Sequence, residues 1–375
     1  MNISTQLRID QHQVEGRFSI NGLPPEQLNY EQRQLRYLCS LAPEYWVGLG
    51  LERLAGHYKG NPDADIRQEV IALYHKISRQ GFLLNHAALA NLIQEYKERL
   101  QDAPFSPKEY KALDWLTRLR TDVDGRLRTP IRPYHSVTGR AGLLGTTPIN
   151  GYKVFREKLL AAPGGSAVYS IDYAGCEVGI LAALSGDKRL CNDYMGVSDL
   201  YSELIGLAHT VCGLTLERGQ LKRLLLMSIY GASPRAVASK LRISEPEAKA
   251  VQKAIMEHYP TAFKWLEQQT VMAYQAKVIQ SRSWQIHVSR KAKPAQVRNW
   301  PIQMAGMEII NKACLIADQK GLKVVGVVHD CIYIESKISR FEQEKKILEE
   351  SMVVASEALL DGFQLKTNID FITKN

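Results

Sequence analysis

The sequence predicts an α+β fold, and three observations carry this prediction. Apolar residues recur at i, i+3 and i+4 through most of the first third of the chain, which is the spacing of one helix face. Short runs of β-branched and aromatic residues appear later and predict strands. A chain of 375 residues with 45% hydrophobic content is also long enough to bury the cores of two or three packed subdomains.

Four helices are expected in the first 121 residues. Breaks rich in Pro, Gly and Asn-Pro separate them, and they span residues 27–41, 65–80, 86–101 and 107–120. Residues 1–24 are polar and show no pattern. A turn at Val123-Asp124-Gly125-Arg126 ends this helical part, and an extended basic segment follows.

Helices and strands are mixed in the remainder of the chain. The expected elements are, in order, a strand over 165–172, helices over 176–184, 216–230, after Pro234 and from Ser244, a helix over 301–319, a hairpin over 322–335, a helix over 340–360 and a strand over 363–373. Ser244 and Glu247 form a capping box at the start of one helix. His329-Asp330 is expected at the bend of the hairpin.

The charge pattern favours a polyanionic partner. The formal net charge is +9, and residues 268–307 contain no Asp or Glu while carrying six Lys and Arg side chains. A second stretch, Arg118 to Arg140, holds six arginines against two aspartates. Each run alone is equally consistent with a solvated surface, but two runs flanking one candidate site point to nucleic acid.

The six cysteines show no C-x-x-C pair, which argues against a zinc site and fits a reducing compartment. The N-terminus lacks an apolar leader segment, and no window approaches a membrane span. We therefore expect a soluble cytoplasmic protein without a membrane partner.

Two aspartates and one helix are the strongest candidates for chemistry. Asp172 and Asp330 each follow a strand-like run, and if these strands are neighbours the two carboxylates could bind two Mg²⁺ ions about 3.5–4 Å apart. In the helix 216–230, four residues at i, i+4 spacing share about one third of the circumference; they are Arg218, Lys222, Leu226 and Tyr230. The cations would suit phosphates, the Leu a sugar and the Tyr a base.

Each feature also has a purely structural explanation. An Asp after a strand is often a helix cap or turn former. The face of helix 216–230 would equally suit an amphipathic helix whose cations extend to solvent above a buried Leu-Tyr pair. The combination of two carboxylates and a cationic helix face favours metal-assisted phosphoryl transfer to a nucleotide.

The order of these motifs resembles the family A (DNA polymerase I-like) DNA polymerases over residues 123–375. The segment from Asp172-Tyr-Ala-Gly-Cys-Glu177 to Asp187 is similar to their motif A, Arg218-x3-Lys222-x3-Leu226-x3-Tyr230-Gly231 to motif B and Val328-His329-Asp330 to motif C. Thr138-Gly139-Arg140 and Asn299-Trp-Pro-Ile-Gln303 match the segments ahead of motifs A and C. The phage- and plasmid-type branch is most similar, since it also has Leu at the Leu226 position and Gly-Phe-x-Leu near the end.

The resemblance implies a right-hand polymerase with palm, fingers and a short thumb, and a helical N-terminal region. The implied parts are residues 1–61 of unknown role, a short thumb over 62–122, palm over 123–187, fingers over 188–297 and the second part of the palm over 298–375. The first 120 residues contain no Asp-x-Glu, the start of the carboxylate set that proofreading requires in this family. The implied enzyme is thus a DNA-templated DNA polymerase without 3′–5′ exonuclease.

Roles follow for the matching residues. Asp172 and Asp330 would bind two Mg²⁺ ions, or Mn²⁺, with help from the Tyr173 backbone carbonyl, which also belongs to the nucleotide site. Arg218 and Lys222 would hold the triphosphate, and Lys222 would also protonate the leaving pyrophosphate.

The remaining roles concern the sugar, the base and the primer–template DNA. Glu177 would block an incoming ribose 2′-OH, Leu226 would lie beside the sugar and Tyr230 would stack near the new base pair. The minor-groove side of the primer end would be contacted by Arg140, Asn299, Gln303 and His329. The partners implied are primer–template DNA and dNTPs, bound by a monomer that other replication or repair proteins could recruit.

Five residues depart from the family pattern. Ala174-Gly175 replaces the usual Ser-Gln of motif A, Gly179 replaces an Arg, Cys331 replaces the Glu after His-Asp, and Leu226 replaces Phe or Tyr. Cys331 and Leu226 leave open a single-subunit RNA polymerase or primase-like enzyme on the same scaffold, although Glu177 argues against ribonucleotide use. An inactive relic that only binds nucleic acid is the third alternative.

Overall fold

The computed structural model describes residues 64–374 except 104–105, 152 and 197–199. The helix expected over 27–41 and the patternless N-terminal segment lie outside these residues. The described chain divides into two compact units, one made of residues up to 132 together with 143–161, and the other of 133–142 together with 162–375. Both contain helices and strands, so the predicted α+β class is confirmed.

The first unit contains four helices and a small antiparallel sheet among its described residues. The helices are α3 (Ala64–Gln80), α4 (His86–Asp102), α5 (Pro107–Thr117) and α6 (Lys153–Leu159), and the 3₁₀ turn η4 is Pro148–Asn150. The strands β1 (Phe82–Leu84), β2 (Arg126–Leu127) and β5 (Leu160–Ala161) pair in the order β2-β1-β5. β3 (Ile131–Arg132) and β4 (Gly142–Leu143) pair with each other.

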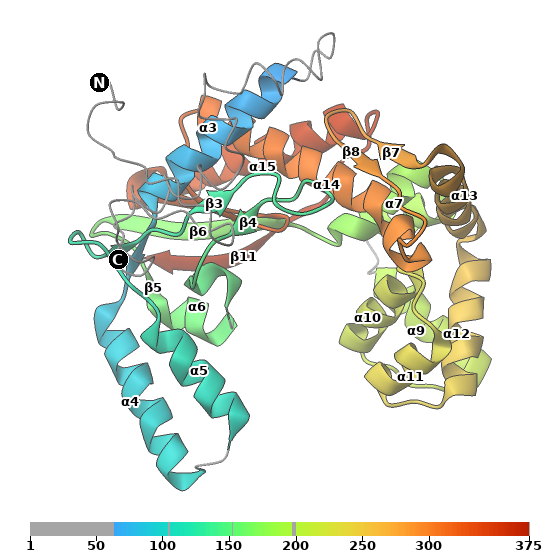
Figure 1. The fold of residues 1–375 in the computed structure, drawn as a ribbon, viewed down its shortest axis with the longest axis horizontal. Coiled ribbons are helices and arrows are strands. Elements are labelled where there is room, and N and C mark those ends of the chain that lie inside the picture. The colour runs from blue at the N-terminus through green and yellow to red at the C-terminus, as the bar shows by residue number, and fades with distance from the viewer. Residues whose placement is uncertain (1–63, 104–105, 152, 197–199, 375) are drawn as a thin grey trace, which may run out of the picture. The chain divides into compact units, whose positions relative to one another are not determined.

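A helix hairpin dominates this unit. Figure 1 shows α4 and α5 side by side. Asn85 and Ser106 cap their N-termini by accepting hydrogen bonds from Ala88 N and Glu109 N. The apolar faces of the two helices close over a core that includes Leu92, Leu116 and Phe155. The helices expected over 65–80, 86–101 and 107–120 are therefore present, with the last ending at Thr117.

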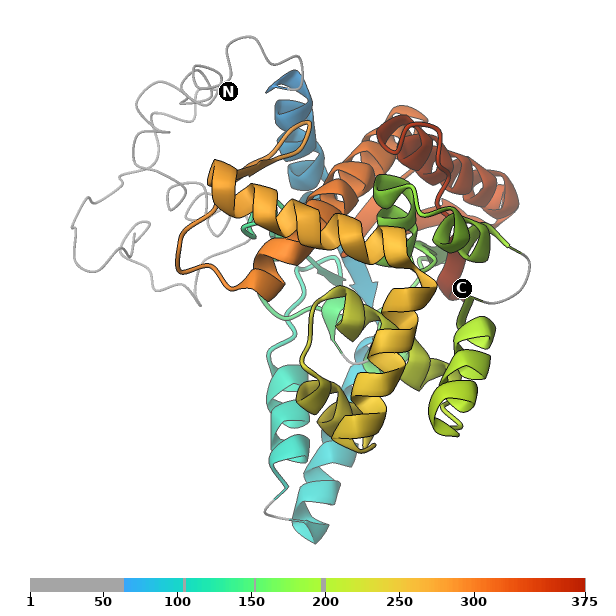
Figure 2. The same ribbon diagram turned by 90° about the vertical axis from the view of Figure 1, so that its right-hand side faces the viewer.

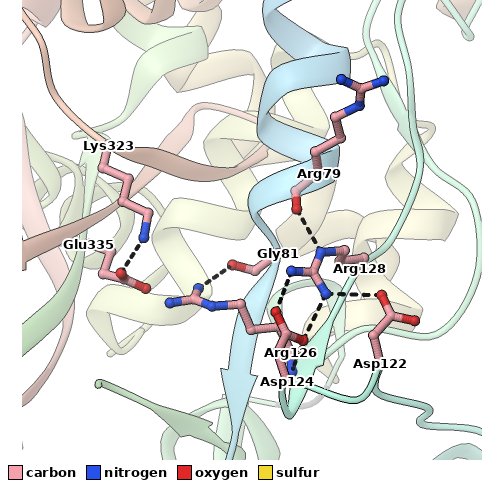
Figure 3. Close-up of polar contacts among 8 residues, drawn as sticks. All are labelled: Arg79, Gly81, Asp122, Asp124, Arg126, Arg128, Lys323 and Glu335. Carbon is pink, nitrogen blue, oxygen red and sulfur yellow. Dashed lines mark hydrogen bonds and ion pairs between the residues drawn. The ribbon is translucent and has the colours of Figure 1, made fainter. Parts of the chain in front are cut away.

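Arg128 holds the turn between the helices and the sheet of this unit (Figure 3). Its guanidinium donates to the Asp122 carboxylate at 3.0 Å, to Asp124 at 2.8 Å and to the Arg79 carbonyl oxygen at 2.6 Å. These bonds hold the pKa of Asp124 well below its ordinary value. Arg126 beside it donates to the Gly81 carbonyl oxygen at 3.1 Å. Two arginines of the basic stretch are thus engaged within the fold.

The second unit is built on a four-stranded antiparallel sheet in the order β11-β6-β10-β9. Its strands are β6 (Ser166–Tyr173), β9 (Val324–Val328), β10 (Cys331–Lys337) and β11 (Thr367–Lys374). The predicted hairpin is confirmed, with His329-Asp330 as its turn and His329 at φ 55°. Lys323 pairs with Glu335 across this hairpin (Figure 3). β11 begins four residues later than the sequence suggested.

Two long helices cover one face of this sheet (Figure 1). α14 (Pro294–Gln319) and α15 (Phe341–Leu359) pack against each other, and the ring of Phe341 lies edge-on to Tyr169 of β6 at 5.0 Å. The Tyr173 hydroxyl donates to the Met352 carbonyl oxygen at 2.6 Å. Because side chains alternate along a strand, Tyr169 and Tyr173 face α15 while Asp172 faces the other side.

The remaining helices of this unit follow one another along the chain. They are α7 (Cys176–Ser185), α8 (Lys188–Met195), α9 (Leu200–Cys212), α10 (Arg218–Ile229), α11 (Pro234–Leu241), α12 (Glu245–His258) and α13 (Pro260–Ala276). The capping box predicted at Ser244 and Glu247 is confirmed. Figure 2 shows the sharp change of direction between α12 (yellow) and α13 (orange), which occurs at Tyr259-Pro260.

A short hairpin connects α13 to α14. Its strands are β7 (Val278–Gln280) and β8 (Gln285–His287). The sequence placed the start of α14 at residue 301, whereas the helix begins at Pro294 and continues through Pro301. No helix among the described residues is long and apolar enough to cross a membrane.

Candidate active site

Asp172 and Asp330 lie side by side at the ends of paired strands. Asp172 is the penultimate residue of β6, and Asp330 lies in the β9–β10 turn, immediately before the first residue of β10. Cys331 is directly opposite Asp172 in the β6–β10 ladder, and the Tyr173 N–H donates to the Asp330 carbonyl oxygen at 3.3 Å. The backbone therefore brings together the two carboxylates that the sequence paired.

Burial makes this a costly place for two negative charges. It raises the pKa of Asp172 to about 6, with a further contribution from the charge of Asp330, while Lys222 lowers the pKa. Burial also raises the pKa of Asp330. Asp172 Oδ1 is buried and has no hydrogen-bond partner among the described residues. An orphaned carboxylate oxygen next to a second buried carboxylate would be stabilised by a cation.

Helix α10 carries the predicted cationic row, and the positive charge of Lys222 in this row lowers the pKa of Asp172. Arg218 and Lys222 are exposed, and the Arg218 guanidinium lies 4.9 Å from the centre of the Tyr201 ring. Leu226 is half-buried one turn further on, and Tyr230 caps the C-terminal end of the helix. Since the charge of Lys222 acts on Asp172, the helix face is within electrostatic reach of the two aspartates.

Glu177, Arg140 and Tyr230 form a second cluster. Glu177 is in the first turn of α7, five residues after Asp172. Its Oε1 is 3.7 Å from Arg140 Nη2. Burial raises the pKa of Tyr230, and the negative charge of Glu177 raises it further. Arg140 in turn lowers the pKa of Asp330, which links this cluster to the aspartate pair.

Helix α14 and the β9–β10 turn supply the remaining predicted residues. Asn299 and Gln303 lie one turn apart on α14 and are half-buried, and Asn299 Oδ1 is buried without a hydrogen-bond partner in the described structure. His329 is exposed in the turn, where its charge acts on Asp330. The Tyr173 ring, by contrast, packs under the sheet against α15, so only its backbone is at the site.

Comparison with known proteins assigns the family. Residues 73–371, well over half of the chain, match the DNA polymerase family A. The chain belongs to this family. The match includes the aspartate pair, the cationic face of α10 and the Asn299–Gln303 segment of α14, so every residue of the candidate site lies inside the family A region.

Several family A relatives resemble the chain over part of their length. The DNA polymerase of Mycobacterium phage L5 is 29% identical over 217 residues, which are 56% of this chain and 33% of the phage protein. DNA polymerase I of Aquifex aeolicus is 25% identical over 67% of this chain and 46% of its own length. The thermostable DNA polymerase I of Thermus filiformis is 24% identical over 70% of this chain and 34% of its own length. The chain spans less than half the length of these relatives.

The fold is that of a family A polymerase domain. The POL domain of Pol1 from M. smegmatis, solved in complex with DNA primer-template and dNTP, superposes with a TM-score of 0.73 at 17% identity, covering 90% of this chain and 74% of that one. The polymerase fold expected from the sequence is therefore confirmed. Its division into thumb, palm and fingers at the expected boundaries stays a prediction.

Two departures from the family A pattern have local causes. At Gly179 a Cβ atom would lie 2.5 Å from Leu365 Cδ2 and 2.6 Å from Tyr194 Cζ, so a larger residue there would require these two side chains to move. Cys331 is buried opposite Asp172 within the sheet, and burial raises the pKa of its thiol to about 12. It is therefore a neutral group at neutral pH, whereas the Glu it replaces would add a charge.

Sequence reasoning missed three residues beside the site. Asp370 lies at an irregularity of β11 and contributes to the raised pKa of Asp172. Arg298 donates from Nε to the Ile229 carbonyl oxygen at 2.9 Å, which ties α14 to the end of α10. Trp284 contacts the loop that carries Arg140. None belongs to a recognisable motif; only the proximity of Arg298 to Asn299 in the sequence could have drawn notice.

Proposed function

We propose that this chain is a DNA-templated DNA polymerase, which adds dNTPs to a primer 3′-hydroxyl. The observation that carries the proposal is the juxtaposition of Asp172 and Asp330 within electrostatic reach of Lys222. Two carboxylates beside a row of cations suit a reaction in which a triphosphate is attacked and pyrophosphate leaves. Family membership and the polymerase fold support the same activity.

The carboxylate pair fits a divalent cation of the Mg²⁺ or Mn²⁺ type. Asp172 Oδ1 is an orphaned acceptor, and oxygen is the ligand that these hard ions prefer. No group of three or more His, Cys, Asp or Glu side chains in the described chain could hold a metal by itself. Mg²⁺ is commonly bound by one or two carboxylates together with substrate phosphates, so a two-carboxylate site suits it and does not suit zinc.

Asp172, Asp330 and the Tyr173 carbonyl would hold such ions, which when bound lower the pKa of the primer hydroxyl and neutralise charge on the phosphates. Arg218 and Lys222 would bind the triphosphate along α10. Lys222 would donate a proton to the departing pyrophosphate, which is supported by the effect of its positive charge on Asp172.

Sugar and base would be selected by neighbouring side chains. Glu177 would occupy the space that a ribose 2′-OH needs, and Tyr230 beside it would border the new base pair, with Leu226 next to the sugar. Arg140, Asn299, Gln303 and His329 would contact the primer end. We further propose that this chain lacks 3′–5′ proofreading, because its first 120 residues contain no Asp-x-Glu.

Two alternatives have weaker support. Leu226 and Cys331 favour a single-subunit RNA polymerase or primase-like enzyme, but Glu177 would occupy the space that such an enzyme needs for a 2′-hydroxyl. An inactive relic would have no reason to keep two neighbouring carboxylates where burial raises the pKa of both. A DNA polymerase would use both Glu177 and the aspartate pair.

Isosteric removal of each carboxylate tests this proposal. We expect Asp172→Asn or Asp330→Asn to lower primer extension to less than a few percent of the parent rate while DNA binding persists, since the amide cannot replace a charged metal ligand. Asp361→Asn is the matched control, because Asp361 is an exposed carboxylate of the same unit.

Mg²⁺ binding gives a second measurement. Mg²⁺ should raise the melting temperature of the parent and of Asp361→Asn, and raise it less in Asp172→Asn and Asp330→Asn. Extension near the parent rate by either site variant would contradict the assignment.

A further inference from the structure

The loop of residues 133–142 carries Thr138-Gly139-Arg140 and is closed by short-range hydrogen bonds. The backbone N–H groups of His135 and Ser136 both donate to the Arg140 carbonyl oxygen at 3.0 Å. Arg140 N–H donates to Ser136 Oγ at 2.9 Å, and Gly139 N–H donates to the Ser136 carbonyl oxygen at 2.9 Å. These bonds shape the loop, but they do not fix it against the rest of the unit.

Trp284 contacts the loop at three places and holds it against the rest of the unit. Its indole Nε1–H donates to the Val137 carbonyl oxygen at 2.8 Å. Its ring stacks on Tyr134, with centroids 5.1 Å apart and planes 8° from parallel. Gly139, at φ +78°, passes so close that a Cβ atom there would lie 3.0 Å from the Trp284 ring and 2.7 Å from Met307 Cε. The Trp284 side chain therefore lies against the loop at three residues, Tyr134, Val137 and Gly139.

Helix α14 holds Trp284 in turn. Trp284 is in the turn between β7 and β8, and the Glu308 carboxylate accepts hydrogen bonds from this turn at 2.6 Å from Ser281 Oγ, 2.6 Å from Ser283 N and 2.8 Å from Ser283 Oγ. Three such bonds to one carboxylate oxygen make a firm anchor. The turn that carries Trp284 is thus attached to the helix that also carries Asn299 and Gln303.

The Arg140 side chain extends from the loop into the space between α14 and Glu177. A Cβ atom at Gly306 would lie 3.4 Å from Arg140 Nη2, and the same nitrogen is 3.7 Å from Glu177 Oε1. The guanidinium therefore lies between the backbone of α14 and the carboxylate of Glu177. A shift of the loop by about 1 Å would remove it from this position, and displacements of that size are sufficient to cost large factors in rate.

We propose that Trp284 is a positioning residue that sets the reach of Arg140 toward the terminal base pair of the primer. This rests on the proposed function, in which Arg140 contacts the primer end. The acceptors in the minor groove, adenine N3 and thymine O2, are arranged alike in correct pairs of either orientation. A donor held at a fixed place can therefore test pair geometry without reading sequence, whereas a donor on a loose loop cannot. Trp284 would thus contribute to discrimination against mispaired primer ends.

A double-mutant cycle tests whether Trp284 acts through Arg140. Trp284→Ala should lower kcat/KM for a matched primer end by about 10–100-fold, and lower it less for a mismatched end, so that the matched-to-mismatched ratio falls. Arg140→Ala should do the same, and adding Trp284→Ala to it should change the rate by less than about twofold.

Trp284→Phe keeps a ring against Tyr134 and should retain most of the matched-to-mismatched ratio. Trp265→Phe changes a half-buried tryptophan of α13 and should leave the ratio unchanged. Independent, multiplicative effects, or an unchanged ratio in Trp284→Ala, would overturn the proposal.

Limited digestion with trypsin tests the positioning without any polymerase assay. The bond after Arg140 should be cut several times faster in folded Trp284→Ala than in the parent or in Trp265→Phe, with the fragments identified by mass spectrometry. A parent that fails to extend primers would refute the proposed function, and the digestion would still decide whether Trp284 holds the loop. An unchanged cutting rate after Arg140 would refute the positioning role even if the parent is an active polymerase.

Discussion

Glu177 is the residue at which a structural and a functional role are hardest to separate. Its place in the first turn of α7 is one that a helix dipole favours for any acid. Its distance of 3.7 Å to Arg140 and its effect on the pKa of Tyr230 go beyond that role, because they connect it to side chains from two other segments. The spacing of five residues from Asp172 was visible in the sequence; these contacts were not.

Removing the Glu177 side chain should therefore change sugar choice. We expect Glu177→Ala to raise kcat/KM for an rNTP relative to the matching dNTP by about tenfold or more, since a clash with the 2′-hydroxyl would disappear. Glu203→Ala removes an exposed acid from the first turn of α9 and serves as the control for a pure dipole effect. If the dNTP/rNTP ratio is the same in the parent and in Glu177→Ala, Glu177 only supports its helix.

Single residues also limit what a sequence can reveal. Asp172 and Asp330 could be paired in advance because each ends a recognisable strand-like run. The raised pKa of Asp172 could not be predicted from the sequence, because it depends on burial and on the charge of Asp330 on the neighbouring strand turn. In the sequence Gly179 is only a departure from the family pattern, whereas the structure shows that Leu365 and Tyr194 would have to move to admit a larger residue there.

At the scale of elements, long periodic segments were predictable and short ones were not. The hairpin at His329-Asp330 and the capping box at Ser244 have strong local signals and lie where expected. The strands β1, β2 and β5 are only two or three residues long, too short for an alternating pattern. The start of α14 was placed too late because Pro301 resembles a helix start, although the helix has already run for two turns before it.

The end of α10 depends on a contact that no local pattern encodes. Arg298 donates to the Ile229 carbonyl oxygen, one of the unpaired carbonyls at the C-terminal end of the helix, and its guanidinium lies 5.7 Å from the centre of the Phe263 ring. The positive charge is favourable at this end of a helix. Tyr230, the next residue after Ile229, is held in place by the same contact.

Arg298→Ala should consequently affect both stability and the nucleotide site. We expect the free energy of unfolding to fall by about 1–3 kcal/mol, because a charged hydrogen bond is lost and a buried carbonyl is left unpaired. KM for dNTPs should rise as Tyr230 becomes less well placed. Arg235→Ala, which changes an exposed arginine of α11 outside both basic stretches, is the control. Chemical denaturation and steady-state kinetics give the two values, and a variant that loses stability with an unchanged KM would show that Arg298 does not position Tyr230.

At the scale of the whole molecule, the two basic stretches differ in how much charge they offer. Arg128 and Arg126 of the first stretch bond to carboxylates and carbonyls of their own unit, and Arg118 pairs with Asp114. In the acid-free stretch, Arg290, Lys291 and Lys293 are exposed. The expectation that both stretches neutralise DNA phosphates is therefore better supported for the acid-free stretch, because the charge of the first stretch is partly neutralised within the fold.

DNA binding should be steep in salt and blind to sequence, with the acid-free stretch supplying most of the slope. Each phosphate contact contributes roughly 0.9 to the slope of log K against log salt concentration. Replacing Arg290, Lys291 and Lys293 by Gln should lower the slope by about 2–3. Arg128→Gln should lower the melting temperature and leave the slope nearly unchanged. Equal effects of both changes on the slope would mean that Arg128 reaches the DNA despite its internal partners.

The most direct test of the whole account is primer extension by the parent chain with Mg²⁺, comparing dNTPs with rNTPs on one DNA template and including a reaction without primer. We predict template-directed extension that requires the primer and strongly prefers dNTPs, because Asp172 and Asp330 would supply the metal site and Glu177 would exclude the 2′-hydroxyl. Preference for rNTPs, synthesis without primer, or DNA binding with no extension at all would contradict it.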